Sequence, residues 1–263
     1  MSGMICPDKF PANRSDEGSV SGILQRDHRS IRGKILYTSK KPERLDQERG
    51  REWFMTTLHT DGRRTIVAHC EIDDRPSVMR DVTLSVDAGW RPLDCFVRLT
   101  VGDRFMGSSW FRFGERVAEC EGFTRLEGRI SQAMDLAAPL ESFQAHPIAC
   151  DSWHFRLFDM GRPDAVQTVD PLLLSSPDHR GATGPMLFKV AMHMAFAGRE
   201  RVTVGAGSFD ALHFQVTSAP GLPEAHPPYD VWCTDDGHFT LLKAQVGGYM
   251  QTYYELVELE GGF

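Results

Sequence analysis

The chain has 263 residues, of which 41% are hydrophobic and 25% charged, and its formal net charge at pH 7 is −7. These proportions are those of an ordinary soluble protein, and the length suits one large β domain as well as two small ones. Lys and Arg are scattered rather than clustered, so we expect no nucleic-acid partner. No apolar run approaches the roughly 20 residues needed to span a bilayer, so we expect no membrane partner either.

The first 22 residues are polar and rich in Pro and Ser, without a charged start followed by an apolar core. They predict a disordered leader over 1–22 rather than a secretory signal. The six cysteines are widely separated and form no CxxC pair. This spacing favours free, half-buried thiols in a reducing cytoplasm, although it leaves disulfides open. We therefore predict a cytoplasmic protein in which residues 23–263 form a single β-barrel domain.

The N-terminal half has the pattern of an antiparallel meander. Residues 31–38 alternate enough for a first strand, and residues 40–50 are a charged loop or surface helical turn. An Asp-Gly pair in the segment 60–63 predicts a hairpin between two neighbouring strands. The expected strands after the charged loop are 53–59, 64–72, 77–86, 93–101, 105–113, 117–123 and 124–130.

The middle of the chain differs, and we predict a lid or crossover insertion over 131–185, helical in part between 131 and 175. Residues 186–196 alternate at period 2, which favours a strand, although their Met and Ala content would also suit a helix. From residue 200 to 259, short β-branched and aromatic runs are cut by Gly, Pro and Asp-Gly. About a dozen strands and few helices predict an all-β, mainly antiparallel fold. Closure into a large barrel would remove the sheet edges and leave room for a ligand cavity.

A family resemblance lies in the last quarter of the chain. It consists of Val-Thr-Val-Gly-Ala-Gly-Ser-Phe-Asp-Ala-Leu-His-Phe at 202–214, Pro-Tyr-Asp-Val-Trp at 228–232 and a terminal Tyr-Glu-Leu at 254–256. This pattern resembles the C-terminal half of lipocalin-like half-barrels found in proteobacterial proteins of unknown function. Its motifs are structural, so the resemblance implies a barrel and carries over no catalytic residue.

The common cofactor motifs are missing. The sequence has no G-x-G-x-x-G after a strand, no G-x-x-x-x-G-K-[ST], no H-E-x-x-H and no G-x-S-x-G. His69 and Glu71 share a strand face and could begin a metal site, but a third ligand would have to come from elsewhere. We therefore expect no cofactor and name no metal ligand, and a metal assembled from residues on distant strands stays open.

The segment from His146 to His154 is the richest in candidate catalytic groups. Together with Asp151 and the neighbouring Trp153, its two histidines could supply a general base and an orienting carboxylate. In an extended strand the two histidines share one parity and Asp151 has the other, so one strand cannot aim all three at one cavity. The alternative is a mouth loop in which His154 bonds to the backbone.

Further candidates lie on predicted strands. His193 and His213 could act as bases in a lumen, but the same alternation is typical of a solvent-facing sheet. Arg98, and Arg112 beside Trp110, combine a guanidinium with aromatic rings, which suits recognition of a carboxylate or phenolate. The alternative is that these arginines cover an outer surface with their aliphatic stems.

The aromatic residues Tyr229, Trp232 and Tyr253 complete the candidates, as substrate-binding groups. A tyrosine can donate a hydrogen bond to a developing oxyanion, but it is also an ordinary strand residue. The leading hypothesis is a cofactor-independent lyase or isomerase acting on a small aromatic or apolar molecule, with a His base and Arg or Tyr stabilising the anion.

Two alternatives stay open. A non-catalytic carrier or sensor of a small hydrophobic ligand would need the cavity but no positioned base. A structural module would fill its barrel with its own side chains. We also expect a homodimer, which would cover apolar strand surfaces.

Overall fold

The computed structural model describes residues 28–262, so the predicted leader lies outside the described residues. One continuous sheet of 15 strands runs in the order β8-β7-β6-β5-β4-β3-β2-β1-β15-β14-β13-β12-β11-β10-β9. All pairs are antiparallel except β9 with β10, which is parallel. The chain therefore starts in the middle of the sheet at β1, runs to one edge at β8, crosses to the other edge at β9 and returns to the middle, where β15 pairs with β1.

The first eight strands are β1 Arg29–Ser39, β2 Glu48–Leu58, β3 Arg64–Ile72, β4 Val78–Val86, β5 Pro92–Val101, β6 Arg104–Phe113, β7 Val117–Thr124 and β8 Gly128–Asp135. The remaining strands are β9 Phe143–Gln144, β10 Gln167–Leu174, β11 Phe188–Val204, β12 Gly207–Ser218, β13 Tyr229–Thr234, β14 Leu241–Val246 and β15 Thr252–Gly261. Three short 3-10 helices are η1 Pro42–Arg44, η2 Ile148–Cys150 and η3 Trp153–Leu157.

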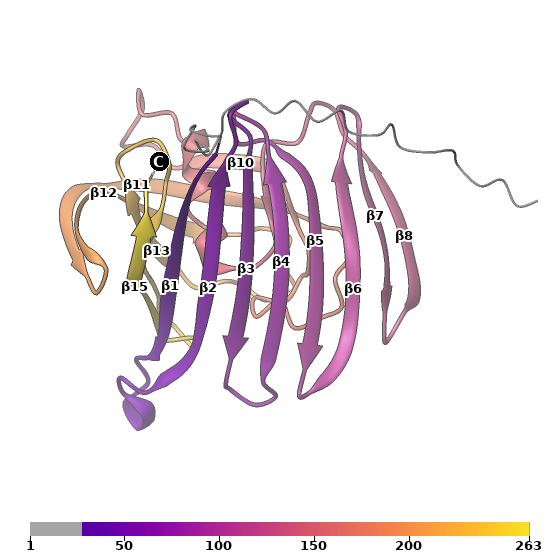
Figure 1. Cartoon of the computed structure of the whole chain (residues 1–263), viewed down its shortest axis with the longest axis horizontal. Coiled ribbons are helices and arrows are strands. Elements are labelled where there is room, and N and C mark those ends of the chain that lie inside the picture. The colour runs from indigo at the N-terminus through magenta and orange to yellow at the C-terminus, as the bar shows by residue number, and fades with distance from the viewer. Residues whose placement is uncertain (1–27, 263) are drawn as a thin grey trace, which may run out of the picture.

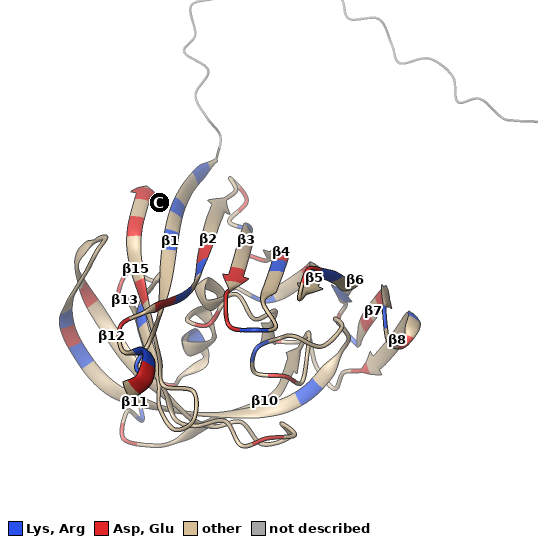
Figure 2. Cartoon of the chain, turned by 90° about the horizontal axis from the view of Figure 1, so that it is seen from below, with Lys and Arg blue, Asp and Glu red and all other residues tan. Residues whose placement is uncertain are grey.

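The sheet curls strongly on itself. Strands β1 to β8 stand side by side, and the long strands β11 and β12 run across behind them (Figure 1). The predicted fold class, a mainly antiparallel β-barrel-like structure with a short helical segment, is confirmed. Charged residues of both signs are interspersed along the strands (Figure 2).

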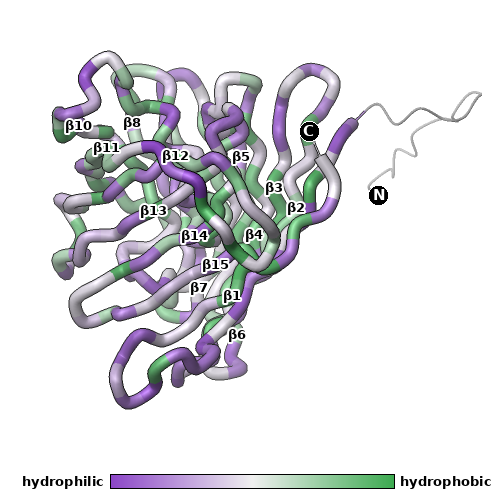
Figure 3. Tube along the Cα trace, turned by 90° about the vertical axis from the view of Figure 1, so that its left-hand side faces the viewer, coloured by the Kyte–Doolittle hydropathy of each residue, from purple (hydrophilic) through white to green (hydrophobic). Residues whose placement is uncertain are grey.

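Alternation along each strand decides which side chains enter the core, because successive strand residues point to opposite faces. On β4, Val82 and Leu84 are buried whereas Met79 is exposed. On β11, Val190 and Met192 are buried, and Lys189 lies on the outer face. Hydrophobic segments gather along the strands in the middle of the molecule, and many peripheral loops are hydrophilic (Figure 3).

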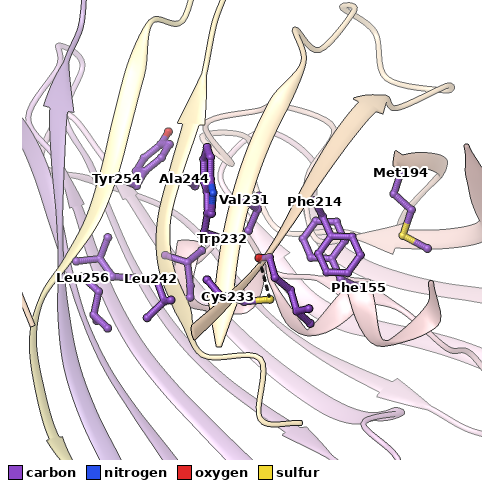
Figure 4. Close-up of a cluster of buried hydrophobic side chains, with 14 of the residues drawn as sticks. Phe155, Met194, Phe214, Val231, Trp232, Cys233, Leu242, Ala244, Tyr254 and Leu256 are labelled. Atoms are coloured by element: carbon purple, nitrogen blue, oxygen red, sulfur yellow. Dashed lines mark hydrogen bonds between the residues drawn. The ribbon is translucent and has the colours of Figure 1, made fainter. Parts of the chain in front are cut away.

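The helical segment η2–η3 lies in the interior of the curled sheet rather than over its mouth. Phe155 stacks on Phe214 of β12 with ring centroids 4.5 Å apart and an interplanar angle of 3° (Figure 4). Phe155 belongs to a core cluster formed mainly with β10–β15, whereas Trp153 belongs to a second cluster formed mainly with β3–β8. The segment therefore joins the two halves of the core.

In the sheet that the structure describes, β8 is an edge strand, and a side-chain contact joins it to the residue just before β11. Gln132 on β8 accepts a hydrogen bond from the backbone N–H of Leu187 at 2.8 Å and donates to its carbonyl at 3.4 Å. This amide replaces a strand partner for one residue. Such a contact leaves fewer unpaired backbone groups at an otherwise open edge.

Several sequence predictions for single segments are wrong in detail. The expected strand 124–130 is interrupted by a turn at 125–127 between β7 and β8, where the Thr124 hydroxyl accepts a hydrogen bond from the N–H of Glu127. The region 40–50 contains a 3-10 turn but also the start of β2. The insertion 131–185 is only briefly helical and includes β10. The strand predicted over residues 186–196 is confirmed by β11.

The cysteines of the described part are free and fully buried rather than half-buried: Cys70, Cys95, Cys120, Cys150 and Cys233. Cys6 lies outside the described residues. Across residues 28–262, no helix has the length and apolar character that a membrane-spanning helix needs.

Candidate ligand-binding site

Two adjoining cavities have volumes of about 320 Å³ and about 140 Å³. The smaller cavity is mainly apolar, and its aliphatic wall comes from β10, β11, β12, β14 and the loop before β13. The members of this wall are Leu172, Leu174, Val190, Met192, Val216, Leu222 and Val246. The larger cavity is lined mainly by polar and charged side chains. Both are bounded by the segment that follows β9.

Asp151 lies in the wall of the apolar cavity, just after η2. Its carboxylate accepts a hydrogen bond from the Tyr229 hydroxyl at 2.7 Å and another from the Gln144 amide. Burial raises the pKa of Asp151 to about 7, against the lowering effect of these two hydrogen bonds. A carboxyl group with this pKa exists in both protonation states near neutral pH, which suits a general acid or base.

His154 lines the same cavity and is 2% exposed. Its Nδ1 lies 2.6 Å from the Ser142 hydroxyl, and its Nε2 has no hydrogen-bond partner within residues 28–262. Burial, aided by the positive charge of Arg156, lowers the pKa of His154 to about 3, so its ring is neutral at pH 7. A buried imidazole nitrogen without a partner is costly unless something else satisfies it.

His146 stands between the two cavities in a strained conformation. Its φ is 72°, a region that few residues other than glycine adopt, and Pro147 follows. The Gln144 side chain accepts its backbone N–H at 2.9 Å, and Arg80 donates to its carbonyl at 3.3 Å. These contacts hold a backbone that costs about 1–3 kcal/mol.

The ring of His146 has a defined tautomer. Its Nε2 lies 3.1 Å from the carbonyl oxygen of Ser176, which can only accept, so Nε2 carries the proton and Nδ1 is the acceptor. Burial and the nearby charge of Arg80 lower the pKa of His146 to about 3. His146 and His154 are therefore both neutral at pH 7.

Glu52 of β2 fixes the start of η2 through hydrogen bonds to its backbone. Its carboxylate accepts the backbone N–H groups of Ile148 and Ala149 at 2.7 and 2.9 Å and the Tyr37 hydroxyl at 2.7 Å. Glu52 is fully buried, and desolvation raises its pKa. This carboxyl group anchors the segment that carries Asp151, so its role is structural.

The remaining predicted substrate-binding residues of the N-terminal half lie away from both cavities. Arg98 and Arg112 are on the outer face of β5 and β6, opposite the buried Val97 and Phe111. Trp110 shares this outer face and is 44% exposed. Trp153 is buried in the core, stacked on Trp90.

The predicted site residues on the C-terminal strands, Tyr229 excepted, also lie outside the lining of the two cavities. His213 stacks on Trp232 at 3.9 Å and pairs with Asp230, outside the lumen. His193 bonds to the hydroxyl of Ser218 on the neighbouring strand. Tyr253 lies under the ammonium of Lys40 at 5.1 Å. The structure thus brings four predicted residues together: His146, Asp151, His154 and Tyr229.

Arg80 and Glu52 are two buried residues of this region that the sequence analysis missed. Arg80 has the same strand parity as Val82 and Leu84, and Glu52 the same as Phe54. A charged residue at an otherwise apolar, inward position was the available signal. Such a residue is rarely buried without a specific partner.

This arrangement can enclose a largely apolar molecule between aliphatic side chains, and the carboxyl group of Asp151 beside it can give or take a proton near neutral pH. In the part of the chain that the structure describes, no group of three or more His, Cys, Asp or Glu side chains is placed to hold a metal ion. His69 instead pairs with Asp81 and Glu71 on the outer face.

Together, the curled antiparallel sheet and the order of its strands define a β-barrel-like protein. The fold is similar to that of a beta-barrel-like protein from Brucella abortus with a domain of unknown function, DUF1849. The TM-score is 0.57 at 12% identity, over 90% of this chain and 98% of the other. This likeness concerns the fold alone.

Two further solved structures align with TM-scores too low to support an argument. A candidate lipoprotein from Parabacteroides distasonis gives 0.34 at 10% identity, over 88% of this chain and 95% of the other. A protein with a YmcC-like fold from Bacteroides fragilis gives 0.33 at 10% identity, over 90% and 96%. No protein-family profile and no curated protein sequence matches the chain.

Proposed function

We propose that this protein binds a small, largely apolar molecule in its lumen. The observation that carries the proposal is the apolar cavity, because its aliphatic wall closes on a smaller set of polar groups that includes Asp151, Tyr229 and His154. Ligand sites commonly combine an apolar lining with a small number of placed polar groups that fix orientation. A barrel filled by its own side chains would leave no such space.

Binding is tested by thermal unfolding with small apolar probes such as 1-octanol, toluene and indole. A probe at 100 times its Kd should add about 2.7 kcal/mol to the free energy of unfolding, which raises Tm by about 5–10 °C. Leu222→Trp, in a loop that lines the cavity, should abolish the shift by filling the space. The matched control is Leu126→Trp on an exposed turn. No shift with any probe, or an equal shift in both variants, would argue against a lumen site.

A second candidate function is conversion of the bound molecule by proton transfer, as in a cofactor-independent lyase or isomerase. It is favoured by Asp151, whose pKa of about 7 makes it a better acid or base at neutral pH than either buried imidazole. Tyr229 donates its hydroxyl to this carboxylate. Its place beside Asp151 suits the stabilisation of a developing negative charge.

This candidate is tested by deuterium incorporation into a bound ligand in D2O, followed by NMR. Catalysed exchange at one carbon that is lost in Asp151→Asn, while binding persists, would support an enzyme. Unchanged exchange in the variant would leave the carrier or sensor as the function. The lipocalin-like relationship, the cytoplasmic location and the homodimer stay proposals, and size-exclusion chromatography with light scattering tests the last.

A further inference from the structure

The larger cavity is strongly cationic in a protein of net charge −7. Its lining has one carboxylate, Asp74, and six basic side chains: Lys41, Arg44, Arg49, Arg75, Arg80 and Arg180. Arg44 and Arg49 both bind Asp74, which neutralises part of this charge. The other four basic side chains form no ion pair with a carboxylate inside the described range 28–262. An excess of positive charge therefore faces the cavity.

Arg80 is the most buried of these cations, at 2% exposure. Its guanidinium donates only to backbone carbonyls, those of His146, Arg180 and Gly181. Carbonyl groups orient the guanidinium but carry no full negative charge to balance it. A buried charge is expected to be paired, so this one is open to an anion from outside the chain.

Arg180 extends the same arrangement. Its Nη2 donates to the carbonyls of Asp74 and Pro76 at 3.0 and 2.9 Å, and its Nε is buried without a hydrogen-bond partner in the described part of the chain. The loop that carries it approaches Arg80 closely. A Cβ at Gly181, where φ is 58°, would clash with the Arg80 guanidinium. The loop is thus shaped to bring these two cations to one wall.

The cationic and apolar cavities adjoin each other. They share His146, Ile148, His179, Met250 and Tyr254 as lining residues. The apolar part, at about 140 Å³, is smaller than the roughly 300–1,000 Å³ of typical ligand pockets. A ligand of ordinary size that entered it would therefore extend into the cationic part.

We propose that the two cavities form one site for an anionic amphiphile, with its apolar chain against the aliphatic wall and its head group beside Arg80, Arg180, Arg75 and Lys41. This inference rests on the proposed lumen-binding function and names the class of its ligand. The head group is a carboxylate, as in a fatty acid, or a phosphate monoester, as in a single-chain phospholipid. Guanidinium groups bind both with paired N–H donors.

The test compares four ligands with the same chain by isothermal titration calorimetry: octanoate, octyl phosphate, 1-octanol and octylammonium. We expect both anions to bind at least about tenfold more tightly than 1-octanol, since a hydrogen bond to a charged group is worth at least that factor. Octylammonium should bind more weakly than 1-octanol. The tighter of the two anions identifies the head group. Raising the salt concentration should weaken the binding of the two anions and leave the binding of 1-octanol unchanged.

The variant Lys41→Gln/Arg75→Gln removes two cations that make no ion pair with any residue of 28–262, so the fold should persist. This variant should bind octanoate about tenfold more weakly than wild type and bind 1-octanol with unchanged affinity. The matched control is Arg104→Gln/Arg129→Gln, which makes the same change in net charge on exposed strand residues away from both cavities. A control that weakened octanoate equally would overturn the proposal in favour of a general charge effect.

Two outcomes separate this proposal from the function on which it rests. If 1-octanol binds as tightly as octanoate, the anionic head-group site is refuted and lumen binding stands. If neither 1-octanol nor either anion binds, both the head-group site and the proposed lumen function fail. Arg80→Met, which removes the central cation, should abolish the preference for octanoate. Its far-ultraviolet circular dichroism would show whether the sheet is retained.

Discussion

Replacing Asp151 by Asn should change how the stability of this protein depends on pH. Asn has the same size but no charge, so it removes the cost of an ionised carboxylate in the lumen. Burial raises the pKa of Asp151 to about 7 in the folded chain, whereas an Asp in an unfolded chain has a pKa of about 3.9. The unfolded chain therefore releases this proton first as pH rises.

The sign follows from the raised pKa. Below about pH 4 Asp151 is protonated in both states and contributes no difference. Between about pH 4 and 7 the unfolded carboxyl ionises while the folded one does not, so wild-type stability falls. The total loss is about 4 kcal/mol, at roughly 1.4 kcal/mol per pH unit, and it is constant above pH 7. The amide of the Asp151→Asn variant cannot titrate, so this loss is absent from the variant.

A smaller, pH-independent effect acts the other way. The carboxylate accepts hydrogen bonds from Tyr229 and Gln144, and an amide with one acceptor oxygen keeps only part of this pattern. The cost is about 1–3 kcal/mol. We therefore expect Asp151→Asn to be less stable than wild type at pH 4 and more stable by about 1–3 kcal/mol at pH 8.

Urea unfolding followed by tryptophan fluorescence from pH 4 to pH 9 measures both curves. The control is Asp159→Asn, whose exposed carboxylate has a pKa lowered by Arg162, so that variant should gain nothing at pH 8. Curves for wild type and Asp151→Asn that run parallel over this range would refute the raised pKa. They would also remove the main argument for Asp151 as an acid or base.

Two further substitutions test the framework around the site. Glu52→Ala should lower the free energy of unfolding by about 3–5 kcal/mol in urea titrations, because it leaves the N–H groups of Ile148 and Ala149 buried without acceptors. A loss below about 1 kcal/mol would show that η2 is held by other contacts. Gln132→Ala should cost about 1–3 kcal/mol by removing both hydrogen bonds to Leu187 at the sheet edge. Amide exchange at Leu187 should then accelerate, and unchanged exchange would contradict the bridging role.

The protonation states of His154 and Asp151 explain why these polar groups are tolerated in the interior. The neutral imidazole of His154 and the half-titrated carboxyl of Asp151 avoid most of the cost of a buried charge. The Arg80 guanidinium instead donates hydrogen bonds to backbone carbonyl groups. A ligand with an anionic head would balance the charge of this guanidinium, which forms no ion pair within residues 28–262.

Much of the candidate site was visible in the sequence as residue types, but not as a geometry. The segment His146 to His154 was singled out because it combines two imidazoles with Asp151. Strand parity argued that a single strand could not aim all three at one cavity. The structure resolves this conflict, because the segment is not a strand: η2 and the positive φ of His146 turn the chain inward.

The sequence by itself determined the strands of the meander, since alternation at period 2 and Asp-Gly turns are local properties of the chain. It also determined that Val190 and Met192 share one face of β11, because strand parity is local too. Which face is the lumen, and which buried groups meet there, only the tertiary structure decided. Asp151 and Tyr229 are 78 positions apart and Arg80 and Gly181 are 101 apart. Their contacts depend on how the sheet curls around the interior segment, and no local propensity encodes that long-range packing.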